Sequence, residues 1–286
     1  MNLLAKSRVV VVGLGLMGGS LAGALRARCH TVVGLARRVE TVAAARHQGL
    51  IDDGTTNPQV ALRKADIVVL ATPVRTIIQQ LTDLAPHLPA GCLVMDLGST
   101  KREVLAAMAE LPLAIQPLGA HPMCGLETSG LDAANPSLYQ GCTFILCPLE
   151  RTSREALALG EALARAVGAT PLCLDGERHD VLVATLSHLS YLIACSLVQT
   201  ATVTTSHDPA AWRIVAGGFR DTSRVAGSDV KMMLDILSTN RAAVLQSAAA
   251  FRSQLDRLVH LIASGGEQPL AAFLEECRSE RRRMYG

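Results

Sequence analysis

The chain has 286 residues, 49% of them apolar and 18% charged, and a formal net charge of +2. This length and composition are typical of a globular protein with one large domain or two medium ones. A basic excess this small gives no electrostatic reason to expect nucleic acid or an anionic membrane surface as a partner, and we expect neither.

The eight cysteines are scattered, without a C-x-x-C pair or clustered histidines that could complete a metal site. We therefore expect no metal, and reduced thiols in a cytoplasmic protein. The apolar N-terminal residues lead straight into a glycine-rich run without a cleavage site, unlike a signal peptide. No run reaches the roughly 18 to 20 uninterrupted apolar residues of a membrane-spanning helix.

The first half of the chain alternates short apolar runs with segments of helical periodicity. Such alternation predicts βαβ units, and therefore an α/β fold whose mostly parallel sheet is covered by helices on both faces. The predicted strands are 8–12, 31–34, 66–71, 92–96 and 142–147, and the predicted helices between them are 20–27, 39–48, 74–84 and 102–110.

Strand patterns end near residue 175, and helical patterns follow at 180–200, 209–216, 229–262 (as one helix or two) and 269–283. We predict two domains, 1–174 and 175–286. The first helix of the second domain is apolar over most of its circumference, and such a helix must be buried on nearly all sides. A homodimer with intertwined helices would bury it, and the basic run at 278–283 is expected to be a solvated tail.

A glycine-rich turn follows the first predicted strand. Gly13, Gly15 and Gly18 have the G-x-G-x-x-G spacing, and a good helix former comes next. These glycines allow a tight turn and a close approach of the backbone to a pyrophosphate, which the helix N-terminus then binds. A purely structural turn is the alternative, but the flanking strand and helix favour a dinucleotide site formed by Gly13, Leu14, Gly15, Leu16, Met17 and Gly18.

The residue that ends the second strand selects the cofactor in such folds, because an acid there binds the ribose 2′-OH of NAD and repels a 2′-phosphate. Here Ala36 occupies that position, followed by Arg37 and Arg38. A small neutral side chain leaves room for the phosphate, and guanidinium groups bind its oxygens. We predict NADP, with NAD as the alternative if the two arginines only face solvent.

Two further segments come directly after predicted strands. Thr72 and Pro73 follow one strand, and Ser99 follows the next. Ligands of open α/β sheets bind outside the carboxyl ends of the strands, so both segments are expected to border the nicotinamide half of the cofactor. Ser99 could instead cap the helix that begins near Lys101.

Titratable groups elsewhere are candidates for binding and proton transfer. His121 lies in a predicted loop before a proline, where a surface histidine is the commoner case. His188 lies in the most apolar helix and needs a partner there, for structure or for function. Arg220 and Arg224 are four residues apart on one helical face, which suits a bound carboxylate, although Asp221 could pair with Arg224 instead.

The stretches GLGLMGGSLA, DLGSTK, GAHPMCGLETSG, SHLSYL and GFRDTSRVAGSD, in this order and spacing, resemble the prephenate/arogenate dehydrogenase family of tyrosine biosynthesis. The similarity extends from residue 8 to about residue 261, and the histidine and arginine stretches are far more specific than the glycine turn. The resemblance implies a Rossmann-like N-terminal domain, an all-helical C-terminal dimerisation domain, and a site in the cleft between them.

The resemblance also implies roles for individual residues. His121 matches the family's catalytic histidine, and Ser99 the serine that hydrogen-bonds it near the nicotinamide. Arg224 matches the arginine that binds a substrate carboxylate, and His188 a histidine on the wall of the helical domain. Two positions are implied to line the same pocket with less defined roles: Arg220 and Glu127.

The implied reaction is oxidative decarboxylation of prephenate to 4-hydroxyphenylpyruvate, with a hydride passing to NAD(P). Leu126, Thr128 and Met233 depart from the pattern of many bacterial members, so the choice between prephenate and arogenate stays open. The arginine pair and GFRDTSR look similar to NADP-dependent arogenate dehydrogenases of cyanobacteria, whereas the acid in HPMCGLETSG is common among prephenate enzymes. The balance favours prephenate slightly.

Two other functions fit parts of the sequence. A β-hydroxyacid dehydrogenase shares the glycine turn but needs a catalytic lysine on the first long helix of its second domain, and 180–200 contains no lysine. A non-catalytic NADP-sensing protein could keep the same fold. The presence of His121, Ser99 and Arg224 together argues against it.

Overall fold

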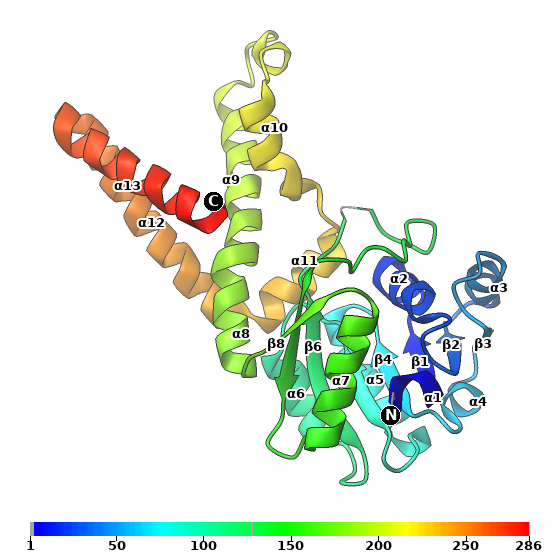
Figure 1. The fold of residues 1–286 in the computed structure, drawn as a ribbon. Helices are drawn as coiled ribbons and strands as arrows, with labels where there is room; N and C mark the ends of the chain where they lie inside the picture. Colours follow the sequence, from blue (N-terminus) through cyan, green and yellow to red (C-terminus); the bar gives the residue numbers. More distant parts are fainter. Residues whose placement is uncertain (1–2, 127, 286) are drawn as a thin grey trace.

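In the computed structural model, which describes residues 3–126 and 128–285, the N-terminal part forms one sheet in the order β3-β2-β1-β4-β5-β6-β7-β8 (Figure 1). All neighbouring strands are parallel except β6 and β7. The strands are β1 (Arg8–Val12), β2 (Thr31–Leu35), β3 (Asp53–Thr55), β4 (Ile67–Leu70), β5 (Leu93–Asp96), β6 (Gln116–Pro122), β7 (Thr143–Pro148) and β8 (Thr170–Cys173).

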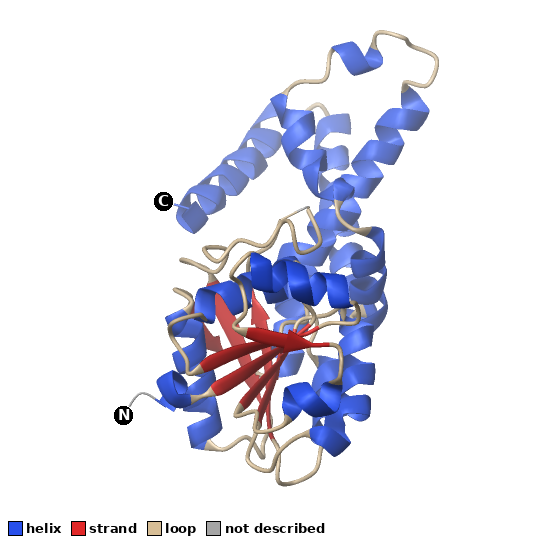
Figure 2. Cartoon of the chain, turned by 90° about the vertical axis from the view of Figure 1, so that its right-hand side faces the viewer, coloured by secondary structure: helices blue, strands red, loops and turns tan. Residues whose placement is uncertain are grey.

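Alternate residues of the central strand face two separate cores. Val9 and Val11 of β1 pack in one cluster with residues of α2 (Leu16–Leu25) and α7 (Arg154–Ala166). Val10 and Val12 pack in the other with residues of α5 (Val74–Leu84) and α6 (Arg102–Ala109). The apolar side chains therefore cover both faces of the sheet, which Figure 2 shows between its helices, and the predicted α/β class is confirmed.

Several elements were not predicted from the sequence. They are the strands β3, β6 and β8, the helix α7, and the short helices α1 (Leu3–Lys6) and α4 (Pro58–Leu62). The strand β6 matters most, because the prediction of a loop around His121 is wrong. Its sequence QPLGAHP has prolines and a glycine, which are rare in strands, but β5 and β7 flank it and supply its hydrogen-bond partners.

From Gly176 onwards the described chain is helical or irregular. The bounds are α8 (Gly176–Val183), a π-helical turn (Ala184–His188), α9 (Leu189–Thr204), α10 (Gly217–Ser223), a 3₁₀ turn (Arg224–Gly227), α11 (Val230–Thr239), α12 (Arg241–Ala263) and α13 (Glu267–Tyr285). The helix predicted at 209–216 is wrong, because only a 3₁₀ turn, Ala211–Arg213, forms there. The segment predicted at 229–262 is two helices, broken at Asn240.

The helical elements project away from the sheet as two arms. Figure 1 shows α9 and α10 in one arm and the hairpin of α12 and α13 in the other. By length and composition, the continuous helix at 176–204 could cross a membrane, yet only 22% of its apolar stretch is buried inside this chain. A single chain therefore does not provide the burial that the sequence of this helix demands, and its exposed apolar residues include Val181, Leu186 and Val203.

Candidate active site

The glycine-rich turn lies between β1 and α2 and has the geometry of a dinucleotide-binding loop. Gly13 has a φ of +93°, a left-handed conformation that favours glycine. A Cβ atom on Gly18 would lie 1.8 Å from the carbonyl oxygen of Gly13, whereas one on Gly15 would meet nothing within 4 Å. The first and third glycines are thus required by the turn itself, and the second faces open space that a pyrophosphate fits.

The three residues predicted to choose the cofactor follow β2. Ala36 is half-buried against the core, and Arg37 and Arg38 are exposed. Neither guanidinium has a hydrogen-bond or ion-pair partner among the described residues. Both groups are therefore available to an anion at the end of β2.

A cavity of about 740 Å³ lies between the carboxyl ends of the strands and the helical part. It brings together predicted residues from both halves of the chain: Gly15, Leu16, Met17, Thr72, Pro73, Ser99, His121, His188 and Arg224. Other predicted residues do not line it: Gly13, Leu14, Gly18, Ala36, Arg37, Arg38 and Arg220. Glu127 lies outside the described residues.

A buried ion pair holds the strand end that carries Ser99. The ammonium of Lys101 contacts the carboxylate of Asp96, and both side chains are fully buried. The same carboxylate accepts hydrogen bonds from the backbone N–H groups of Gly98, at 2.7 Å, and Ala120, at 3.0 Å. Asp96 thus ties the loop that carries Ser99 to the residue before His121.

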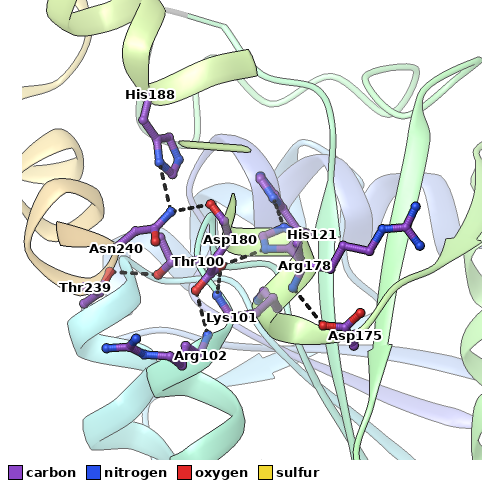
Figure 3. A network of polar contacts seen from close by, with 12 residues as sticks. Thr100, Lys101, Arg102, His121, Asp175, Arg178, Asp180, His188, Thr239 and Asn240 are labelled. Atoms are coloured by element: carbon purple, nitrogen blue, oxygen red, sulfur yellow. Dashed lines mark hydrogen bonds and ion pairs between the residues drawn. The ribbon is translucent and has the colours of Figure 1, made fainter. Parts of the chain in front are cut away.

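His121 is linked to two titratable residues of α8. Its Nδ1 lies 2.8 Å from Nε2 of His179, and Nδ1 of His179 lies 2.8 Å from Oδ1 of Asp180. Figure 3 labels His121 and Asp180, the two ends of this line of contacts. His179 is fully buried and Asp180 nearly so. The N-terminal strand β6 and the helix α8 therefore share one line of polar contacts.

Asp180 also caps the helix α6. Its two carboxylate oxygens accept the backbone N–H groups of Lys101, at 2.7 Å, and Arg102, at 2.9 Å. Burial alone would raise the pKa of Asp180, but the hydrogen bonds from His179, Arg102 and Lys101 together lower it below its ordinary value. The carboxylate is therefore ionised at neutral pH and can only accept hydrogen bonds.

These contacts define the tautomers of both rings. Nδ1 of His179 must carry a proton to donate to the ionised Asp180, so Nε2 of a neutral His179 is an acceptor. Nδ1 of His121 then donates to it, which leaves Nε2 of His121 with a free lone pair. Burial, followed by the charges of His179, Lys101 and His188, holds the pKa of His121 well below its ordinary value. His121 is thus a neutral imidazole whose Nε2 is unprotonated.

His188 has the opposite orientation of donor and acceptor. The amide nitrogen of Asn240 donates to the backbone oxygen of Asp180, at 2.8 Å, and lies 3.4 Å from Nδ1 of His188. Because an amide N–H can only donate, Nδ1 of His188 accepts and Nε2 carries the proton. Burial lowers the pKa of His188 to about 4, against the opposing effect of Asp180. His188 is neutral at pH 7 and serves as a hydrogen-bond donor.

Comparisons with known proteins identify the family. The family model described as "Prephenate dehydrogenase, nucleotide-binding domain" matches residues 21–171, and that described as "Prephenate dehydrogenase, dimerization domain" matches residues 175–276. The chain belongs to the prephenate dehydrogenase family. Among its relatives, the prephenate dehydrogenase of Bacillus subtilis is 30% identical over 96% of this chain and 76% of that protein. The cyclohexadienyl dehydrogenase of Zymomonas mobilis is 34% identical over 96% of this chain and 94% of that protein.

Solved structures of this family have the same fold. The prephenate dehydrogenase of Aquifex aeolicus, in complex with hydroxyphenyl propionate and NAD+, aligns with a TM-score of 0.91 at 31% identity, over 99% of each chain. The arogenate dehydrogenase of Synechocystis aligns with a TM-score of 0.86 at 31% identity, over 97% of this chain and 99% of that one. A 3-hydroxyisobutyrate dehydrogenase of Salmonella typhimurium, at 18% identity and a TM-score of 0.58, shares the fold alone.

Several polar residues of this prephenate dehydrogenase family member were not predicted from the sequence: Lys101, His179, Asp180 and Asn240. The segment GERHD looks like an ordinary solvated helix start. The available signal was a histidine and an acid side by side next to a long apolar helix, where burial requires partners. His188 was predicted, but its position also depends on the π-helical turn, which shifts the later helix face by one residue.

Stability should depend on the protonation of His188. Its folded pKa of about 4 lies below the ordinary value of 6.5. Between these values the unfolded chain binds a proton that the folded protein does not, so stability is complete above about pH 6.5 and falls as the pH drops toward 4. The loss at His188 is on the order of 3 kcal/mol.

Urea unfolding at fixed protein concentration from pH 7.5 to pH 4 measures this effect. The variant His188→Gln should show a shallower fall in unfolding free energy than the wild type, because its side chain does not titrate. Equal slopes would contradict the assignment of a buried neutral imidazole.

Proposed function

We propose that the protein oxidatively decarboxylates prephenate to 4-hydroxyphenylpyruvate with NADP, a step of tyrosine biosynthesis. The observation that carries this proposal is the single cavity that His121 of β6 and Arg224 of the helical part both line, next to the glycine-rich turn. A base, an anion-binding cation and a dinucleotide loop around one cavity are what this reaction requires.

His121 is the base in this proposal. Its Nε2 lone pair accepts the proton of the C4 hydroxyl as a hydride leaves C4. Loss of the C1 carboxylate as CO₂ then makes the ring aromatic, and the C4 oxygen takes the proton back from His121 to give the phenol. Bound NADP supplies the hydride acceptor. Ser99, which lines the cavity at the end of β5, is proposed to orient His121 near the nicotinamide. Because aromatisation drives the reaction, the protein mainly positions the reactants and removes one proton.

The helical part binds the substrate in this proposal. Arg224 pairs with a substrate carboxylate, and the Nε2–H of His188 donates a hydrogen bond to a substrate oxygen. The roles predicted for Arg220 and Glu127 remain proposals, and Arg220 does not line the cavity in this chain.

Arogenate is the second candidate substrate, because the Synechocystis arogenate dehydrogenase resembles this chain at the same identity as the Aquifex enzyme. Prephenate carries a keto group where arogenate carries an ammonium. The described residues that line the cavity include two cationic side chains, Arg224 and Lys231. They include one acidic side chain, Asp229, whose carboxylate caps α11. Among the described lining residues this balance is positive and favours the more anionic substrate, which is prephenate, whereas Glu127 in the pocket would favour the ammonium of arogenate.

We further propose a cytoplasmic homodimer, with 1–174 as the dinucleotide-binding domain and 175–286 as the helical domain for dimerisation and substrate binding. The exposed apolar face of the helix at 176–204 and the match to a dimerisation domain support the dimer. A second copy would supply the burial that one chain leaves incomplete.

Cofactor choice is tested together with substrate choice. Reduced cofactor is followed at 340 nm for each pair of prephenate or arogenate with NADP or NAD. Prephenate with NADP should give the highest kcat/KM. In Ala36→Asp the KM for NADP should rise by at least about tenfold, because a carboxylate repels the 2′-phosphate, whereas the KM for NAD should not rise. A wild type that prefers NAD would contradict the proposed role of the arginine pair.

Loss of the base should lower turnover. His121→Asn removes the Nε2 lone pair but keeps a polar side chain of similar reach, so kcat should fall by about 10²-fold to 10⁴-fold with little change in KM. Steady-state kinetics measures both constants, and the thermal midpoint checks the fold. Full turnover in this variant would exclude His121 as the base.

Loss of the substrate cation should weaken binding instead. Arg224→Ala should raise the substrate KM by about tenfold to 100-fold, the usual effect of losing a charged hydrogen bond, and should change kcat less. Arg213→Ala, which removes an exposed arginine outside the cavity, is the matched control and should leave the KM within twofold. A fall in kcat at constant KM would contradict a binding role for Arg224.

A further inference from the structure

The contact behind His121 suggests where the abstracted proton goes. His179 is fully buried and is not among the residues that line the cavity. It contacts Nδ1 of His121 through its Nε2 and Oδ1 of Asp180 through its Nδ1, both at 2.8 Å. The two rings are 5.1 Å apart between centroids and steeply inclined, which suits an in-plane hydrogen bond better than stacking.

We propose that the positive charge created when His121 accepts this proton does not stay on His121. A second proton passes from His121 to His179, which then holds the charge as an imidazolium paired with Asp180. This inference rests on the proposed function, because it concerns the proton of the substrate hydroxyl. His179 acts through His121 and touches no substrate, so it is a positioning residue that also receives a proton.

The transfer balances in two linked steps. The C4 hydroxyl proton binds Nε2 of His121, and the proton on Nδ1 of His121 passes to Nε2 of His179. His121 ends as a neutral imidazole of the other tautomer, and His179 carries one positive charge while its Nδ1–H still donates to Asp180. When the C1 carboxylate leaves as CO₂, the electrons of the broken bond reach the C4 oxygen, the two transfers reverse, and Nε2 of His121 returns the proton to that oxygen. The phenol of the product therefore forms without net release of a proton.

The surrounding charges favour this location. Burial, and with it the ammonium of Lys101, makes a cation on His121 unfavourable. A cation on His179 lies in contact with a carboxylate that the two backbone N–H groups at the N-terminus of α6 hold in its ionised form. The titratable and charged groups that act on the two rings include Lys101, which is paired with Asp96 at the end of β5, and Asp180 and His188 on the helical side.

The substitution His179→Gln separates proton transfer from orientation. The glutamine carbonyl can accept the hydrogen bond from Nδ1 of His121 and so preserve its tautomer, but an amide does not accept a proton at these pH values. We expect kcat to fall by at least about 30-fold while the KM stays within threefold. We also expect the acid limb of kcat to move to lower pH by at least one unit, because the charge must then stay on His121.

Asp180→Asn provides the second variant. The asparagine removes the charge that would stabilise an imidazolium at His179. An amide oxygen in the place of Oδ1, which also accepts the N–H of Lys101, can still accept from Nδ1 of His179, so we expect kcat to fall by at least about tenfold with the tautomers unchanged. Nitrogen-15 NMR of the ligand-free protein should find the proton of His121 on Nδ1 in the wild type and in both variants. Asp175→Asn is the matched control, since it keeps a good cap of α8 and should leave kcat within twofold.

The outcomes distinguish the alternatives. If His179→Gln keeps its kcat within threefold and its acid limb in place, His179 only orients His121 and the proposal is overturned. If nitrogen-15 NMR of the wild type finds the proton of His121 on Nε2, the assigned direction of the hydrogen bonds is wrong and the proposal fails as well. It also fails if Asp180→Asn keeps its kcat within threefold, because the carboxylate then stabilises no charge on His179. A wild type that oxidises neither prephenate nor arogenate would refute the proposed function, and the NMR result would still decide the direction of the hydrogen bonds.

Discussion

The site depends on one carboxylate at the junction of the two halves of the chain. Asp180 belongs to α8, yet its oxygens accept the first N–H groups of α6, and α6 starts where β5 ends at the cavity. The backbone N–H groups at a helix N-terminus need acceptors, and an anion there is stabilised by the helix dipole. The contact that completes α6 therefore also sets the ionisation of Asp180, the tautomer of His179 and the basic nitrogen of His121.

The two cavity histidines show that similar burial can produce different chemistry. Burial lowers the pKa of both His121 and His188, so both are neutral at pH 7. The neighbours then decide which ring nitrogen carries the proton. The contacts with His179 and Asp180 leave Nε2 of His121 with a lone pair, whereas the amide of Asn240 leaves Nε2 of His188 with a proton. A base and a donor thus lie in one cavity without any charge on either ring.

The sequence predicted much of the sheet and the residues that line the cavity, but not what lies behind them. Strands such as β1 are continuous apolar runs with a strong local signal, and the glycine turn has a fixed spacing. In β6, by contrast, local preference opposes the strand, and only β5 and β7 impose it. The contact of His121 with His179 joins residues 58 positions apart, and neither periodicity nor spacing carries that information.

The two walls of the cavity differ in how firmly they are held. His121 lies in a sheet strand whose neighbours Ala120 and Pro122 are buried, and a buried ion pair supports the adjoining loop. Arg224 lies in a 3₁₀ turn after α10, and neither element has a buried residue in this chain. Few buried contacts mean low local stability, so His121 is held more rigidly than the wall that carries Arg224. Under the proposed function, a change of substrate would need only alter the helical wall, and the strand that carries His121 could remain unchanged.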